Sequence, residues 1–568
     1  MAQKASSFST IAILLLILIS PSFASFPSVP ILNSDSICNL TPHPDFCKSI
    51  LPSDKSITKF DFSRICLRQS LSNAYSLLGS IKYFLRLPST SYLSTIRALE
   101  DCKFLAELNV DFLSYTLQNI NAKEDNNNLD SSMAETLHAL LSAVLTNTET
   151  CLEGLGASEA ASRVEKGLLP SILNGDRFHG ISLAIFKHAW VHEITKPLTG
   201  RRNHGFLNLG KAKNSPLPLI MSGHDQAIYE SVSGQKPAHP DVGEGVNVSQ
   251  LVVVNPDGSG DFTTINEAVA AAPNNTGNGT QYFVIYVVSG VYEEYVVIPK
   301  KKQNLMMIGD GIDKTIITGN RSVADGNGMT TFNSATFAVV GSGFVAVNIT
   351  FRNTAGAINH QAVAVRNGAD KSTFYRCSFE GYQDTLYTHS LRQFYKECDI
   401  YGTIDFIFGN AAVVFQDCNI YPRLPLEHQF NTITAQGRRD PNQSTGISIQ
   451  NCVIKAANDL ASSNRTTKTY LGRPWKEFSR TIVMQSFMDD LIEPSGWAEW
   501  VGNFALDTLY YAEYRNSGPG SNTDARVNWQ GYHKNLTGSD AAVFTVDNLI
   551  QGGTWLDPTG VPYNEDLD

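Results

Sequence analysis

The chain has 568 residues, of which 42% are hydrophobic and 17% are charged, and its formal net charge at pH 7 is −10. This length exceeds one ordinary domain, and the composition is that of a soluble globular protein. Residues 246–568 carry 23 Lys and Arg against 32 Asp and Glu, whereas residues 1–245 carry 21 against 22. A net-negative C-terminal half argues against nucleic acid as a partner and against tight ionic adhesion to a polyanion.

Residues 1–24 are predicted to be a secretory signal peptide. A basic start at Lys4 is followed by an apolar run over residues 11–19 and by the small residues Ser22 and Ala24. The run is too short to span a bilayer, so a retained anchor is only the alternative. Nine N-x-S/T sequons agree with a secreted, extracellular glycoprotein that has no membrane contact after signal removal.

Residues 33–190 are predicted to form an all-α four-helix bundle preceded by a short hairpin. Within residues 65–85, apolar side chains recur at steps of three and four, as one buried helical face requires. Similar runs cover residues 92–117, 132–155 and 159–194. The apolar positions of the first run are Leu67, Leu71, Ala74, Leu78, Ile81 and Leu85.

The opening of this bundle, CNLTPHPDFC over residues 38–47, resembles the C-x2-T-x2-P-x2-C signature of plant invertase and pectin methylesterase inhibitors. The resemblance implies the disulfides Cys38–Cys47 and Cys102–Cys151. It also implies that the bundle is an inhibitor-like pro-region; a bundle that merely assists folding is the alternative.

Residues 191–245 are predicted to be a low-order linker, since they are rich in Pro, Gly, Ser and His. The dibasic pair Arg201-Arg202 within it is a candidate site for a processing protease. Families with this architecture usually have apolar residues after the basic pair, whereas Asn203-His204-Gly205 follow here. The cleavage position therefore stays open.

Residues 246–568 are predicted to form an all-β domain, a right-handed parallel β-helix. One short pattern, aligned on a cysteine column, recurs with centres 28, 21, 20 and 34 residues apart. Such spacing suits coils that keep one strand in register while the loops on one side vary. A β-sandwich or a propeller is the alternative. The copies are VNITF (347–351), YRCSF (375–379), KECDI (396–400), QDCNI (416–420) and QNCVI (450–454).

Two aspartates occupy equivalent places in consecutive copies of this pattern. Asp384 and Asp405 each follow a cysteine by seven residues and a glycine by three. Equivalent residues of neighbouring coils stack, so the two carboxylates are expected on adjacent strands, about 4.8 Å apart at the backbone. Two carboxyls this close do not both ionise freely, so one can serve as an acid while the other stays an anion. A stacked Asp ladder that only supports turns is the alternative.

Amide, cationic and aromatic residues accompany the pair. The amides of Gln361 and Gln383 can donate hydrogen bonds to a developing oxyanion without adding charge. Arg473 can hold the carboxylate of Asp405, or a substrate carboxylate, through two parallel hydrogen bonds. Trp475 offers an aromatic face to a sugar ring.

Five motifs, present in order over about 190 residues, look like the sequence marks of plant pectin methylesterases. The resemblance implies hydrolysis of the methyl esters of homogalacturonan to pectate and methanol in the plant cell wall. It assigns Asp405 as nucleophile, Asp384 as acid and then base, and Gln361 and Gln383 as oxyanion donors. The motifs are GVYEE (290–294), QAVAV (361–365), GYQDTLY (381–387), GTIDFIFGN (402–410) and LGRPW (471–475).

The same resemblance extends to the groove, the late cysteines and the partners. Arg473 would orient Asp405, while Trp475, Tyr387 and Phe408 would contact substrate. It favours a disulfide between Cys418 and Cys452. It implies no metal and no other cofactor. The expected partners are methyl-esterified homogalacturonan, the chain's own pro-region or separate inhibitor proteins, and a processing protease.

Two other functions remain open on the same scaffold. Polygalacturonases and polysaccharide lyases are also β-helical, and glycosidases also act through two carboxylates, but they cut the polymer rather than its ester. The other alternative is a non-enzymatic wall-binding module. Release of methanol against formation of new reducing ends separates these possibilities.

Overall fold

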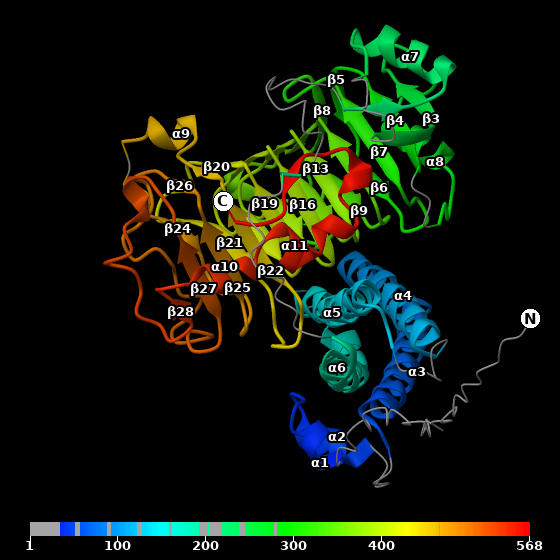
Figure 1. Ribbon diagram of the computed structural model, residues 1–568, viewed down its shortest axis with the longest axis vertical. Helices are drawn as coiled ribbons and strands as arrows, with labels where there is room; N and C mark the ends of the chain where they lie inside the picture. Colours follow the sequence, from blue (N-terminus) through cyan, green and yellow to red (C-terminus); the bar gives the residue numbers. More distant parts are fainter. Residues whose placement is uncertain are drawn as a thin grey trace, which may run out of the picture.

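A helical unit and a long stack of parallel strands make up the chain (Figure 1). The computed structural model describes residues 34–50, 57–87, 92–121, 128–157, 162–191, 203–204, 217–237, 245–277, 281–326, 328–464 and 466–567. The expected signal peptide (1–24) and the pair Arg201-Arg202 lie outside these residues. Among the helices described, none has both the length and the apolar character needed to cross a bilayer.

The N-terminal unit is an antiparallel bundle of four long helices, as the apolar periodicity predicts. The apolar stripe of residues 65–85 faces the bundle core, where Leu67 and Ile81 are fully buried. The first long helix begins at Thr58, whose side chain and that of Asp61 form a capping box. The helices are α1 (Ser34–Cys38), α2 (Pro44–Ile50), α3 (Lys59–Leu85), α4 (Leu93–Asn121), α5 (Ser131–Gly156) and α6 (Ser162–Trp190).

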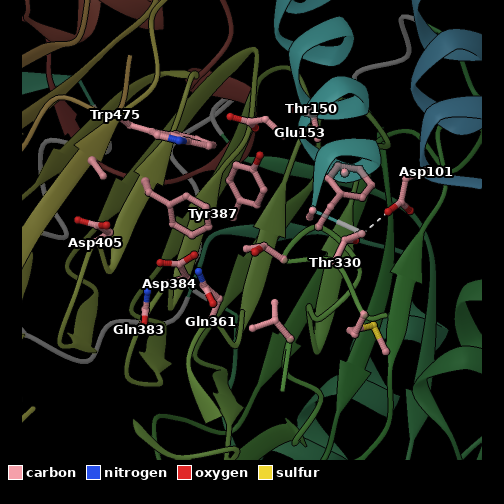
Figure 2. Close-up of a pocket in the computed structure, with 18 of the residues that line it drawn as sticks. Asp101, Thr150, Glu153, Thr330, Gln361, Gln383, Asp384, Tyr387, Asp405 and Trp475 are labelled. Atoms are coloured by element: carbon pink, nitrogen blue, oxygen red, sulfur yellow. Dashed lines mark hydrogen bonds between the residues drawn. The ribbon is translucent and has the colours of Figure 1, made fainter. Parts of the chain in front are cut away.

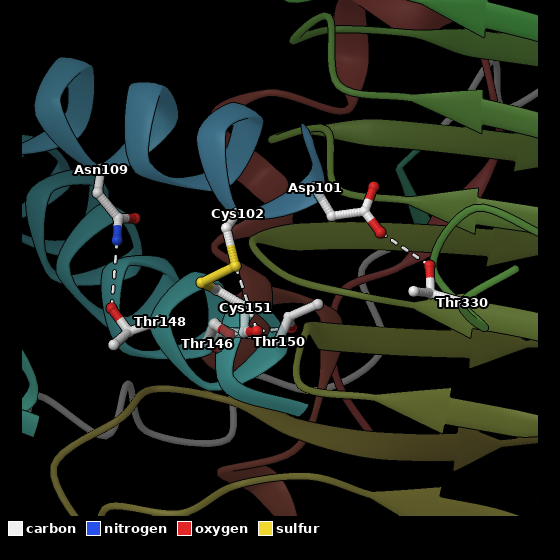
Figure 3. The surroundings of a disulfide bond; sticks show 8 residues. All are labelled: Asp101, Cys102, Asn109, Thr146, Thr148, Thr150, Cys151 and Thr330. Carbon is white, nitrogen blue, oxygen red and sulfur yellow. Dashed lines mark hydrogen bonds between the residues drawn. A yellow bond between two sulfur atoms is a disulfide. The ribbon is translucent and has the colours of Figure 1, made fainter. Parts of the chain in front are cut away.

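Two disulfides are present in the helical unit. Cys38–Cys47 joins α1 to α2, and Cys102–Cys151 joins α4 to α5 across 49 residues (Figure 3). Closing a loop of that length removes about 4 kcal/mol of conformational entropy from the unfolded chain. The second bridge therefore joins the two helices that contact the C-terminal unit.

The C-terminal unit is a parallel β-helix of three sheets, and it confirms the predicted fold class. Each coil contributes one strand to each sheet, and consecutive coils pair in parallel register. The 12-stranded first sheet contains β2 (Leu219–Ile220), β3 (Val246–Val254), β4 (Gln281–Val287), β7 (Leu305–Gly309), β10 (Val345–Val347), β13 (Ser372–Tyr375), β16 (Arg392–Lys396), β19 (Ala412–Gln416), β22 (Gly446–Gln450), β25 (Arg480–Met484), β27 (Tyr510–Tyr514) and β28 (Tyr532–His533).

The other two sheets complete each coil. The 8-stranded sheet contains β5 (Gly290–Glu293), β8 (Thr315–Gly319), β11 (Thr350–Asn353), β14 (Ser378–Glu380), β17 (Asp399–Gly402), β20 (Asn419–Pro422), β23 (Val453–Ile454) and β26 (Phe487–Met488). The 7-stranded sheet contains β6 (Val296–Ile298), β9 (Phe337–Val339), β12 (Val365–Asn367), β15 (Leu386–Thr388), β18 (Ile407–Gly409), β21 (Asn431–Gln436) and β24 (Thr469–Gly472). Their inward side chains form one continuous apolar core, in which Phe374, Tyr395 and Phe415 stack on one another.

The cysteine column marks the turn from the first sheet to the second. Each turn has one residue in the left-handed conformation, and the next residue points into the core. At Asp417, for example, φ is 56°, and the following Cys418 is 1% exposed. The left-handed residues of successive coils are Asn348, Arg376, Glu397, Asp417, Asn451 and Gln485.

The expected disulfide between Cys418 and Cys452 is not formed, and both residues are buried free thiols. They are stacked neighbours, because the backbone N–H of Cys418 donates to Cys452 Sγ at 3.3 Å. Side chains at equivalent positions of parallel coils point the same way, about 4.8 Å apart. A disulfide needs Cβ atoms about 3.8 Å apart and directed toward one another. The stacking that makes the column visible in the sequence thus disfavours bonding along it.

Part of the expected linker is folded, so the prediction of low order does not hold for residues 217–237. The two-residue strand β2 pairs in parallel with β3, and α7 (Gly223–Ser233) follows it. Tyr229 of α7 is 4% exposed and packs edge-on against Tyr286. This segment extends the first sheet by one strand and covers its end.

Short elements close the remaining ends of the β-helix. A short helix, α8 (Ile265–Ala271), begins at Thr264 with a capping box and covers the first coils. The chain end packs on the outer face of the first sheet, where β1 (Asn203–His204) pairs antiparallel with β29 (Tyr563–Asn564) (Figure 1). The other short elements are η2 (Ala357–Asn359), α9 (Asn458–Ala461), η3 (Pro519–Ser521), α10 (Gly538–Ala542), α11 (Val546–Ile550), η4 (Gly552–Thr554) and η5 (Asp557–Thr559).

Candidate active site

Asp384 and Asp405 lie on neighbouring coils, each just before a strand of the 7-stranded sheet. The in-register pairs β14–β17 and β15–β18 flank them and bring them to equivalent positions. Both have left-handed backbones, with φ of 63° and 51°, and are 8% and 6% exposed. Non-glycine residues rarely adopt this conformation, which here directs both carboxyls into one cavity.

Asp405 is clamped by an arginine. Arg473 Nε donates to Oδ1 at 2.9 Å, and its Nη2 donates to Oδ2 at 2.7 Å. The hydroxyl of Thr432 donates to Oδ1 at 2.6 Å. This two-pronged, charge-assisted contact fixes the plane of the carboxylate. Arg473 also packs over the ring of Trp500, 4.4 Å from its centroid.

Asp384 has the opposite electrostatic environment. Burial raises the pKa of its carboxyl well above the usual range, and the charge of Asp405 raises that pKa further, while Arg473 opposes both. Desolvation disfavours the charged form, and so does a neighbouring anion. One carboxyl of the pair is therefore bound by a cation, whereas the environment of the other favours its protonated form.

The remaining residues proposed from the sequence line the same cavity, which has a volume of about 590 Å³. Figure 2 shows the side chains of Gln361 and Gln383 beside Asp384. Tyr387 and Phe408 stack at 4.2 Å between ring centroids, and Trp475 lies 5.9 Å from Phe408. All eight predicted site residues are thus brought together: Gln361, Gln383, Asp384, Tyr387, Asp405, Phe408, Arg473 and Trp475.

The helical unit forms one wall of this cavity, through residues that the sequence motifs do not mark. Thr150 and Glu153 of α5 and Asp101 of α4 line it together with the two aspartates (Figure 2). The hydroxyl of Thr150 lies 3.0 Å from His389 Nε2. Burial lowers the pKa of His389 to about 3, so its ring is neutral.

Ion pairs and an apolar cluster hold α5 and α6 against the β-helix. Glu149 pairs with Lys476 at 2.7 Å and with Arg439 at 2.5 Å, and Arg439 also meets Asp176 of α6 at 2.8 Å. Lys476 makes a second pair with Glu153 at 2.6 Å. Side chains of both units, including the cavity aromatics, belong to one continuous apolar cluster.

Phe332 and Trp500 also line the cavity, and sequence reasoning missed both. Neither lies in one of the five motifs, and aromatic residues are too common for their position alone to mark a site. Within the described ranges, no three His, Cys, Asp or Glu side chains gather in a way that would hold a metal ion. On the β-helix side, the cavity is lined by the carboxyls of Asp384 and Asp405, by glutamine amides and by an arginine, a set suited to acyl transfer.

A parallel β-helix that presents two unequal carboxyls, two glutamine amides and aromatic rings in one cavity is typical of a carbohydrate-acting hydrolase of the acyl-transfer type. Comparisons identify the family. Residues 251–553 match the family model for pectinesterase, and residues 33–185 match that for the plant invertase/pectin methylesterase inhibitor. The chain belongs to the pectinesterase family and is a carboxylic ester hydrolase with an N-terminal inhibitor-like domain.

Individual relatives are similar to this chain over most of its length, and a solved structure is similar over a little more than half of it. The chain is 52% identical over 547 residues to probable pectinesterase/pectinesterase inhibitor 41 of Arabidopsis thaliana, covering 94% of this chain and 95% of that relative. It is 44% identical over 565 residues to pectinesterase 2 of Citrus sinensis, covering 97% and 98%. The solved pectin methylesterase from carrot is 55% identical, with a TM-score of 0.54, and covers 56% of this chain and 98% of its own.

Proposed function

We propose that this pectinesterase removes methyl groups from homogalacturonan through an aspartyl nucleophile, Asp405, and that its helical domain keeps the site closed until the chain is cut. The observation that carries the first part is the asymmetry of the carboxyl pair. Arg473 orients Asp405 as an anion, while burial and the neighbouring charge raise the pKa of Asp384. A nucleophile beside an acid is what ester cleavage requires.

The first half of the reaction forms an acyl-enzyme. A carboxylate oxygen of Asp405 attacks the carbonyl carbon of the methyl ester, and negative charge develops on the carbonyl oxygen. The amides of Gln361 and Gln383 donate hydrogen bonds to that oxygen. When the bond to the methoxy oxygen breaks, Asp384 gives it a proton, and methanol leaves.

The second half restores the enzyme. Asp384, now ionised, takes a proton from a water molecule, and the resulting hydroxide attacks the acyl carbon. The bond to Asp405 breaks, which yields the free galacturonate carboxyl and returns Asp405 as a carboxylate. Tyr387 and Phe408 stack on one another, Trp475 meets Phe408 edge-on, and these rings offer aromatic surface to a sugar ring beside the reacting ester.

The second part of the proposal concerns residues 33–190 as a pro-region. Thr150 and Glu153 lie where a polymer chain would pass, so substrate and helices compete for one space. Separate inhibitor proteins would bind the same surface. A processing protease acting at Arg201-Arg202 would detach the helical domain, and the active product would work in the extracellular plant cell wall after loss of residues 1–24.

The test uses the full chain with a specific protease sequence in place of Arg201-Arg202. Methanol and new reducing ends are measured on highly methylated pectin before and after the cut. We expect methanol without reducing ends, little activity in the uncut chain, and none in Asp405→Asn. Reducing ends in excess of methanol would replace the esterase by a chain-cutting enzyme. Full activity of the uncut chain would refute the inhibitory role.

A further inference from the structure

The coil that follows Asp405 contacts both of the turns that carry the site aspartates. In the 7-stranded sheet, β15, β18 and β21 pair in register, so Asp384, Asp405 and Thr432 occupy equivalent positions on three consecutive coils. In the 8-stranded sheet, β14, β17 and β20 pair in the same way, and Arg423 directly follows β20. Arg423 and Thr432 therefore lie at the two ends of one connection, each beside the turn of the preceding coil.

Thr432 holds Asp405 through its hydroxyl and through its backbone. The hydroxyl accepts from the backbone N–H of Asp405 at 2.9 Å and donates to Oδ1 of the same residue at 2.6 Å. The backbone N–H of Thr432 donates to Thr403 O at 3.1 Å, and its carbonyl accepts from the N–H of Phe406 at 3.4 Å. Thr432 is fully buried, so bulk water does not compete for these contacts. The turn that carries Asp405 is thus fixed on both sides of the aspartate.

These contacts make the two carboxylate oxygens of Asp405 unequal. Oδ1 accepts from Thr432 and from Arg473 Nε, whereas Oδ2 accepts from Arg473 Nη2 alone among the described residues. Each oxygen of a carboxylate offers about two lone-pair positions. Oδ2 therefore keeps one lone pair for the carbonyl carbon of the ester.

Arg423 ties the two turns together from the outer side of the coil. Its backbone N–H donates to Gly402 O at 2.7 Å, in the turn that carries Asp405. Its Nη1 donates to Gly381 O at 3.0 Å, in the corresponding turn of the preceding coil. Its Nη2 donates to the hydroxyl of Tyr382 at 2.8 Å, and the guanidinium lies 3.9 Å from the centroid of that ring. One side chain and its own backbone thus link the segments that precede both aspartates.

We propose that Arg423 and Thr432 are positioning residues, which hold the separation of the two aspartates and the orientation of Asp405 Oδ2 during the reaction. This inference rests on the proposed function and deepens it. Asp384 and Asp405 both have left-handed backbones, a conformation that persists only where surrounding contacts over-determine it. Neither Arg423 nor Thr432 is among the described residues that line the cavity, so their removal should change kcat rather than KM.

The experiment measures kcat and KM for methanol release from highly methylated pectin by the cut full chain with both pieces present. Thr432→Val replaces the hydroxyl by a methyl group and is expected to lower kcat about ten-fold at unchanged KM, the value of one hydrogen bond to a charged group. Thr432→Ser keeps a hydroxyl and is expected to restore kcat. Thr434→Val is the matched control on the same strand, since its buried hydroxyl donates to Leu471 O at 2.9 Å and does not contact Asp405.

A second variant tests the outer contact. Arg423→Gln is expected to lower kcat about ten-fold at unchanged KM, because a small displacement of reacting groups is enough to slow the chemical step. Arg352→Gln is its control, since Arg352 projects from the same sheet and its Nε pairs with Glu380 at 2.6 Å. An unchanged kcat in Thr432→Val or in Arg423→Gln would overturn the role of that residue. A fall of equal size in its control, or a change confined to KM, would do the same.

A double variant separates positioning of Asp405 from damage to the coil. Thr432→Val is expected to cause no further loss in the Asp405→Asn background, because the charged oxygen that the hydroxyl orients is already gone. A further ten-fold loss there would overturn the inference. Failure of the proposed function has a different signature, since Asp405→Asn would then release methanol at the rate of the unmodified chain. Loss of activity in Asp405→Asn together with an unchanged kcat in Thr432→Val and Arg423→Gln would refute this inference alone.

Discussion

The helical domain and the β-helix present their functional side chains in different ways. In the β-helix, Asp384 and Asp405 occupy equivalent turns of in-register coils, so their relation is set by a backbone repeat that continues over the whole stack. In the helical domain, Asp101, Glu149 and Thr150 project from the surfaces of α4 and α5 and meet the β-helix through separate contacts. The geometry of the two aspartates is therefore set by the repeat, whereas the docking of the helical domain rests on one apolar cluster and on a few polar pairs that can be removed one at a time.

The largest effect should come from Asp405, the proposed nucleophile. Asp405→Asn keeps the shape of the side chain but removes its charge, and it should lower kcat for methanol release by about 10⁴-fold or more. The helical domain should remain bound, since none of its side chains makes a hydrogen bond or ion pair with Asp405 among the contacts described. Asp399→Asn on the preceding strand β17 is the control, and a comparable loss there would point to damage of the coil.

The second-largest loss of activity should come from the proposed oxyanion donors. Gln383→Ala removes one amide donor and should lower kcat by about 10²–10³-fold with little change in KM, because the hydrogen bond strengthens only as charge develops. Gln250→Ala, on an exposed position of β3, is the matched control. A rise in KM at constant kcat would instead assign Gln383 to substrate binding.

Variants of the ion pairs between the domains test how the helical domain is held on the β-helix. Glu149→Gln removes the charge that faces Lys476 and Arg439 in a partly buried setting. We expect the uncut chain to release methanol about 10- to 100-fold faster, since the two cations lose their shared partner. Glu107→Gln, whose pair with Lys82 lies within the helical domain, should leave the activity of the uncut chain unchanged.

The repeat explains which features were predictable. The cysteine column predicts the register of the coils and so predicts that Asp384 lies beside Asp405, in agreement with the pairing of β14 with β17. The disulfide between Cys418 and Cys452, which the family resemblance favoured, is wrong, because stacked side chains on neighbouring coils run parallel and both residues are free thiols. Residues 217–237 were missed because a two-residue strand has no periodicity to detect.

Sequence patterns did not predict the individual contacts between the two domains. Nothing in the helical periodicity distinguishes Asp101 or Thr150 from other polar residues on α4 and α5, since their role depends on how two separately patterned units dock. Arg366 directly follows the motif QAVAV (361–365), but only the structure shows that Phe332 covers its guanidinium and that two of its nitrogens have no hydrogen-bond partner. Local repeats could therefore be predicted, whereas surfaces that meet across the fold could not.

The smallest predicted effect concerns the stability cost of the carboxyl pair. An aspartate has a pKa of about 3.9 in the unfolded chain, and Asp384 has a higher pKa in the folded state. The native state is therefore penalised as pH rises from the unfolded-state pKa through the raised folded-state pKa. Asp384→Asn removes that penalty and should raise Tm by about 1–2 °C at pH 8, a gain that shrinks toward zero below pH 4. Asp524→Asn, at an exposed position, serves as the control. A Tm gain that does not depend on pH would mean that packing, rather than charge, produces it, and the asymmetry assigned to the two aspartates would then lose its electrostatic basis.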